Sequence, residues 1–205
     1  MRPISREDVV AALVVLALGA PLAYMLASAF ADGETRRREA PLRSLLGDSA
    51  YEALVRGRPS DVHYLGNDRL VPDFELRDQD GQTFRMSEAR GRVVVLNFWT
   101  VTCAPCIEEM PSLVELSRIV AERDDIELVT ISTDRTWEEV RTVIPEGTPL
   151  RVLLDPDRSV VRGRFGTRMF PETWVVDRRG VIRLRVDGAR PWSSAIAVDA
   201  LESFL

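Results

Sequence analysis

The two cysteines of the chain, Cys103 and Cys106, are separated only by Ala104 and Pro105. Two thiols at this spacing can form a disulfide with each other and exchange it with a disulfide of another protein. Exchange proceeds by attack of a thiolate on a disulfide sulfur, through a mixed disulfide between the partners. A disulfide-stapled scaffold would need more cysteines, and a structural zinc site would need four ligands. The pair therefore predicts redox chemistry.

The sequence on either side of the cysteines predicts the elements that position them. The run RVVVLNFW at 92–99 is typical of a strand buried on both faces, and apolar residues at near-helical spacing predict a helix over 104–122. Free N–H groups and the helix dipole stabilise a thiolate at a helix start. We therefore expect Cys103 to be the exposed, attacking sulfur. Cys106, one turn into the helix, would resolve the mixed disulfide.

The remaining pattern alternates strands with helices. A β-hairpin is expected between residues 74 and 86, where Asp80-Gly81 marks the turn. Further strands are expected at 126–132, 150–154, 172–176 and 181–186, and further helices at 136–143, near 157–165 and at 192–205. This order predicts an α/β domain over 71–205, with a mixed sheet and helices on both of its faces.

The start of the chain predicts a membrane segment. No charged residue occurs from Val9 to Ala31, and roughly 20 apolar residues suffice to cross a bilayer as a helix. Arg2 and Arg6 precede the run, as in a signal peptide or signal anchor. We expect residues 1–31 to form a retained signal anchor, with cleavage after Ala31 as the alternative. Residues 32–70 would be a linker or stalk, with a possible short helix.

Charge bears on location and on partners. Four arginines follow the apolar run, at 36, 37, 38 and 43, and by the positive-inside rule they favour a cytoplasmic domain. Long domains, however, translocate largely regardless of such charges. We therefore expect a single-pass protein of the cell membrane whose catalytic domain is extracytoplasmic. The net charge of −5 gives no basic footprint for nucleic acid.

Three groups of motifs occur in a recognisable order. They are NFW at 97–99, CAPC at 103–106 and EEMP at 108–111, with VPDFEL at 71–76 and DQDG at 78–81 upstream and FPETWVVD at 170–177 downstream. Together they resemble the thioredoxin superfamily, and most of all its membrane-anchored TlpA/ResA/CcmG branch. The resemblance covers 71–205. It implies a thioredoxin-like fold with an N-terminal hairpin and an inserted strand and helix between 126 and 143.

The resemblance also implies site residues beyond the two cysteines. Pro171 would be the cis-proline beside the disulfide, and Glu109 matches an acidic position that this branch carries after its cysteine pair. Asn97 stands where thioredoxins proper carry a buried acid, so Glu109 would be the only carboxylate near the cysteines. The alternative for Glu109 is a solvated helix residue. Thr102 departs from the branch, which usually has Trp there, and this leaves substrate choice and redox potential open.

The activity implied by the resemblance is that of a protein disulfide reductase. Its substrates would be disulfides of exported proteins, with apocytochrome c during haem attachment as one possibility. Electrons would come from a membrane reductase of the CcdA/DsbD kind. No cofactor or metal is implied.

Two other function classes remain open. A peroxiredoxin-like peroxidase is suggested by Thr100, three residues before Cys103, but that site needs a proline where Leu96 stands. An SCO-like copper metallochaperone would need a wider cysteine spacing and a histidine downstream. The one histidine, His63, lies upstream of both cysteines.

Overall fold

The computed structural model describes Arg43 and residues 70–205. The expected signal anchor (1–31) and nearly all of the expected linker (32–70) lie outside the described residues, so both remain predictions. Within the described part, none of the helices has the length and apolar character needed to cross a membrane.

A five-stranded mixed sheet forms the centre of the domain. Its strand order is β5-β4-β3-β6-β7, with β3, β4 and β5 parallel and with β6 antiparallel to both β3 and β7. The strands are β3 (Val93–Trp99), β4 (Ile126–Ser132), β5 (Val152–Leu154), β6 (Glu172–Val176) and β7 (Ile182–Asp187). All residues of β3 are buried, as expected for a β-branched strand in the middle of a covered sheet.

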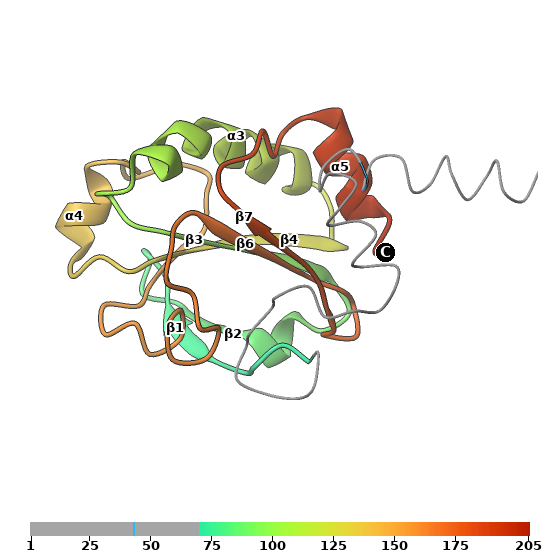
Figure 1. Cartoon of the computed structure of the whole chain (residues 1–205), viewed down its shortest axis with the longest axis horizontal. Coiled ribbons are helices and arrows are strands. Elements are labelled where there is room, and N and C mark those ends of the chain that lie inside the picture. The colour runs from blue at the N-terminus through green and yellow to red at the C-terminus, as the bar shows by residue number, and fades with distance from the viewer. Residues whose placement is uncertain (1–42, 44–69) are drawn as a thin grey trace, which may run out of the picture. The chain divides into compact units, whose positions relative to one another are not determined.

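Different elements cover the two faces of the sheet (Figure 1). The helices α3 (Ala104–Val120) and α5 (Ala195–Glu202) lie on one face. The other face carries the hairpin of β1 (Glu75–Arg77) and β2 (Thr83–Arg85), followed by the 3-10 helix η1 (Met86–Ala89). The hairpin is confirmed. The inserted helix is α4 (Trp137–Arg141), which follows β4.

Each face has its own apolar core, and β3 supplies alternate residues to both because successive side chains of a strand point to opposite faces. Val93 and Val95 pack with the α3 and α5 side. Val94, Leu96 and Phe98 pack with the hairpin side. The sheet is thus fixed from both sides, which holds the end of β3 rigidly where the cysteines follow.

The helix expected near 157–165 is wrong. This stretch forms a series of turns, and Arg158 has a left-handed φ of 57°. The buried carboxylate of Asp155 accepts the backbone N–H groups of Val160 and Val161 at 3.1 and 2.7 Å, so these groups are not available to a regular helix. The prediction of helices on both faces of the sheet is therefore correct for one face only. The hairpin, η1 and this loop cover the second face.

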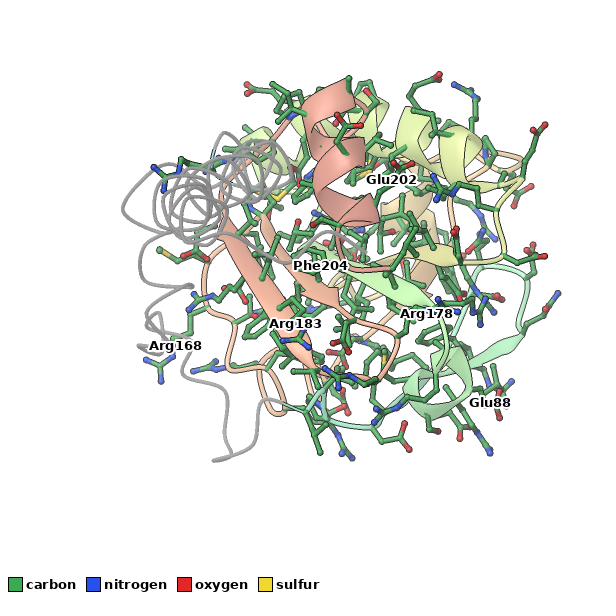
Figure 2. The ribbon with its side chains drawn as sticks, turned by 90° about the vertical axis from the view of Figure 1, so that its right-hand side faces the viewer. Glu88, Arg168, Arg178, Arg183, Glu202 and Phe204 are labelled. Carbon is green, nitrogen blue, oxygen red and sulfur yellow. A yellow bond between two sulfur atoms is a disulfide. The ribbon has the colours of Figure 1, made fainter. Side chains whose placement is uncertain are left out.

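The chain enters the domain at the end opposite to the cysteines. Leu70 pairs with Val181, and the Val71 N–H donates to Gly180 O at 2.9 Å, beside the turn that joins β6 to β7. The cysteines instead follow the far end of the seven-residue strand β3, about 20 Å away at ~3.3 Å per residue. Figure 2 looks onto the entry end, where Arg178 and Arg183 are labelled.

Candidate redox site

The disulfide Cys103–Cys106 lies at the start of α3, with a Cα–Cα distance of 5.3 Å. Cys103 is the N-cap residue, and its Sγ accepts the Cys106 N–H at 3.2 Å. Pro105 occupies the first turn, where a missing N–H costs little. Cys103 is partly exposed and Cys106 is fully buried. After reduction the same N–H would stabilise a thiolate on Cys103.

A buried carboxylate that the sequence reasoning missed holds the turn before Cys103. Asp134 accepts the Thr100 hydroxyl at 2.6 Å and the Val101 N–H at 3.0 Å, and the Cys103 N–H in turn donates to Thr100 O at 3.1 Å. Asp134 follows β4, whose last residue, Ser132, pairs with the end of β3. The sequence could have indicated Asp134 through the expected parallel pairing of these two strands, because the residues that follow parallel strands meet at one edge of a sheet. Glu109 is therefore not the only acid close to this segment.

Glu109 is buried on α3, with only 4% of its surface exposed, so it is not a solvated helix residue. Its Oε1 accepts the Asn97 amide N–H at 2.8 Å. Its Oε2 accepts the Arg190 backbone N–H at 3.1 Å and the Trp192 indole N–H at 3.2 Å. Burial raises the pKa of Glu109, and these three donors and the Arg190 charge counteract part of that rise. The neighbouring Glu108 is exposed.

The peptide bond between Phe170 and Pro171 is cis. Phe170 packs against the apolar cluster that contains Cys106 and against which Cys103 also packs. Two residues after Pro171, the Thr173 hydroxyl accepts the second Asn97 amide N–H at 2.9 Å. A polar network from Thr173 through Asn97 to Glu109 thus joins the start of β6 to α3, three residues after Cys106.

Two large apolar side chains that are close in sequence to Cys106 and Pro171 are exposed. Ile107 and Met169 are exposed by 42% and 77%. Thr102, where the resembling branch carries Trp, is exposed. In the part of the chain that the structure describes, no group of three or more His, Cys, Asp or Glu side chains could hold a metal ion.

Comparison with known proteins decides the family. Residues 68–185 match the family model described as "AhpC/TSA family". The chain belongs to this family. The thioredoxin-like protein YneN of Bacillus subtilis is 27% identical over 113 residues, which are 55% of this chain and 66% of YneN. The thiol-disulfide oxidoreductase ResA of the same organism is 28% identical over 144 residues, which are 70% of this chain and 77% of ResA.

A solved structure supports the fold independently. A DsbE-type thiol:disulfide interchange protein of Chlorobium tepidum superposes with a TM-score of 0.59, over 68% of this chain and 99% of that one. At 24% identity this likeness shows the thioredoxin-like fold. With the ResA relatives and its own disulfide, the chain is a thiol-disulfide oxidoreductase of the ResA type.

Proposed function

We propose that this protein is a membrane-anchored, extracytoplasmic reductase of disulfides in exported proteins. The observation that carries the proposal is the Cys103–Cys106 disulfide at the start of α3, with one sulfur accessible and the other buried. An accessible and a buried thiol divide attack and resolution between them. The uncharged run 9–31 supports the anchor, and Leu70, the first residue of the described domain, lies at the end of the sheet opposite to the disulfide.

The reaction transfers two electrons from the dithiol form to a substrate disulfide. The Cys103 thiolate attacks one substrate sulfur, forms a mixed disulfide and releases the other substrate sulfur as a thiolate. The Cys106 thiolate then attacks Cys103 Sγ, restores the Cys103–Cys106 disulfide and releases the second substrate thiolate. The substrate is reduced to a dithiol and the enzyme is oxidised. A membrane reductase of the CcdA/DsbD kind would return the two electrons.

Glu109 supplies the proton acceptor in this scheme. Cys106 must lose its proton to attack, yet it is fully buried, where ionisation is disfavoured. Glu109 follows it by three residues on the same face of α3 and is buried too. Its burial raises its pKa, which brings a carboxylate nearer to the range where it can exchange a proton at neutral pH.

Two exposed apolar side chains support the proposed substrate class: Ile107 directly follows Cys106, and Met169 lies two residues before Pro171. The exposed side chains of Ile107 and Met169 favour contact with apolar segments of partly unfolded exported proteins. Apocytochrome c, which must hold its own cysteines reduced for haem attachment, is a substrate of this kind.

Cysteine variants of the full chain test the assignment. Cys103→Ser should abolish reduction of a protein disulfide, whereas Cys106→Ser should accumulate mixed disulfides because the resolving thiol is missing. Non-reducing electrophoresis of extracts would reveal the trapped partners, and mass spectrometry would identify them.

The controls concern the class and the direction of the reaction. Full activity in Cys103→Ser would contradict the assignment, and turnover of hydrogen peroxide without turnover of disulfides would indicate a peroxidase instead. A reduction potential near thioredoxin's, about −270 mV, would agree with a reductant, while one near about −120 mV would make the protein an oxidant.

A further inference from the structure

Residues 188–192, which belong to the segment between β7 and α5, contact both Pro171 and Glu109, and we call them the strap. At its start the Gly188 N–H donates to Pro171 O at 2.9 Å. At its end the backbone N–H of Arg190 and the indole N–H of Trp192 donate to Glu109. The strap thus touches both the cis-proline and the buried acid, although it lies more than 80 residues after the cysteines.

A second anchor fixes the strap to α3. The Ser112 hydroxyl lies 2.8 Å from Glu109 O and 3.2 Å from Arg190 O, so its one hydrogen is shared between these two carbonyls, and its oxygen accepts the Trp192 N–H at 3.2 Å. Trp192 is fully buried in the core on the α3 side of the sheet. The two N–H groups that reach Glu109 are therefore held in place before any reaction occurs, as groups that position a catalytic acid must be.

The two oxygens of the Glu109 carboxylate are bound by different elements. Asn97 on β3 binds Oε1, and the strap alone supplies both donors to Oε2. Hydrogen bonds to a carboxylate favour its ionised form, and they are stronger than bonds between neutral groups. The strap therefore controls the orientation of one oxygen and part of the proton affinity of the whole group.

We propose that the strap is a working part of the redox site, in which the Arg190 and Trp192 N–H groups position the Glu109 carboxylate for proton exchange with Cys106. The inference rests on the proposed role of Glu109. Trp192 acts through Glu109, so it is a positioning residue rather than a catalytic one.

The charges near Glu109 are few enough to interpret a titration. From the strap it faces the Arg190 guanidinium, whose charge lowers the pKa of Glu109. On its own helix the titratable neighbour is Cys106. The side chains that face it from β3 and β6 in the described structure, Asn97 and Thr173, are neutral.

Single-turnover kinetics of the full chain test the strap. Mixing the reduced protein with an aromatic disulfide releases one coloured thiolate on attack by Cys103 and a second on resolution by Cys106. The rate of the second release should fall on the acid side as Glu109 becomes protonated. Trp192→Phe removes one donor to the ionised form, so this acid limb should move upward by about one pH unit.

The domain offers a matched control on the other face of the sheet. Trp174 is equally buried, and its indole N–H donates to the buried carboxylate of Glu172 at 2.5 Å. Trp174→Phe therefore removes a comparable hydrogen bond and comparable packing but does not touch Glu109. It should leave the acid limb where the wild type has it. In a Glu109→Gln background, Trp192→Phe should not move the profile either.

The outcomes separate the strap from the role of Glu109. If Glu109→Gln abolishes the acid limb while Trp192→Phe leaves it in place, the strap has no positioning role. If Glu109→Gln itself keeps the limb, the proposed role of Glu109 fails, and the inference with it. Should Trp192→Phe fail to fold, Ser112→Ala is the second variant. It removes the hydroxyl that contacts Arg190 O, the Trp192 N–H and the Glu109 backbone oxygen, but it removes no donor to the carboxylate. An unmoved limb in this variant overturns the inference.

Discussion

At the scale of single residues, Asn97 and Glu109 form a buried hydrogen-bonded pair between the central strand and the helix that carries the cysteines. Asn97 lies on the central strand, cannot ionise, and uses both N–H groups of its amide to orient Glu109 and Thr173. The ionisable member of the pair is therefore Glu109, on the helix. Its position three residues after Cys106 places the acid on the same buried helix face as the resolving cysteine.

Replacing Glu109 by Gln should change two rates with opposite signs. Removing a negative charge near the cysteines favours their thiolates, so the alkylation rate of the reduced protein should reach its midpoint at a lower pH. Removing the proton acceptor should slow the resolving step roughly 10²-fold near neutral pH. Alkylation rate against pH and the second thiolate release measure the two effects.

Glu108→Gln is the matched control for this prediction, because Glu108 is exposed and adjacent on the same helix. It removes the same formal charge without touching the buried network, and both rates should stay close to those of the wild type. Equal effects of the two variants would mean that net charge alone, and not the buried position of Glu109, governs the thiols.

At the scale of elements, the sequence allowed most of the sheet to be predicted, because unbroken β-branched runs carry a strong local signal. Strands β4 and β6 form over 126–132 and 172–176 as expected. The prediction of a helix over 157–165 was wrong because the side chain of one residue, Asp155, accepts hydrogen bonds from backbone N–H groups of this stretch. The same limit applies to the site: the strap and Asp134 reach it through tertiary contacts, which local pattern does not report.

One of the contacts between the hairpin and the sheet is an ion pair of a single arginine, and its contribution can be tested. Arg151, just before β5, contacts the buried Asp78 at 3.2 Å and Glu127 at 3.0 Å, and its guanidinium lies 5.2 Å from the centre of the Phe84 ring. Arg151→Ala leaves the Asp78 carboxylate without its cation. The free energy of unfolding should fall by about 1–3 kcal/mol, measured by chemical denaturation.

Arg85→Ala is the comparison for Arg151, since Arg85 also belongs to the hairpin. Its partner Glu75 and Arg85 itself are about half exposed, at 53% and 51%. Such exposed pairs contribute about 1 kcal/mol or less. If Arg85→Ala lowered the free energy of unfolding as much as Arg151→Ala does, the buried contact of Arg151 with Asp78 would have no special role in stability.

At the scale of the whole molecule, the redox site and the point of chain entry lie at opposite ends of β3. Leu70 joins the domain beside the β6–β7 turn, where Figure 2 shows Arg178 and Arg183, while Cys103 follows Trp99 at the other end. The described domain thus begins at the end of the sheet that is farther from the disulfide.

The location of the domain is a matter of competing signals in the sequence. The uncharged run 9–31 favours export or anchoring, whereas Arg36, Arg37, Arg38 and Arg43 after it favour a cytoplasmic domain. A folded domain of this length translocates largely regardless of those charges. A reporter active only outside the cytoplasm, fused after Leu205, should therefore be active, and deletion of 9–31 should silence it. Activity of a cytoplasm-only reporter at the same position would mean that the arginines dominate, and the substrates would then have to be sought among cytoplasmic proteins.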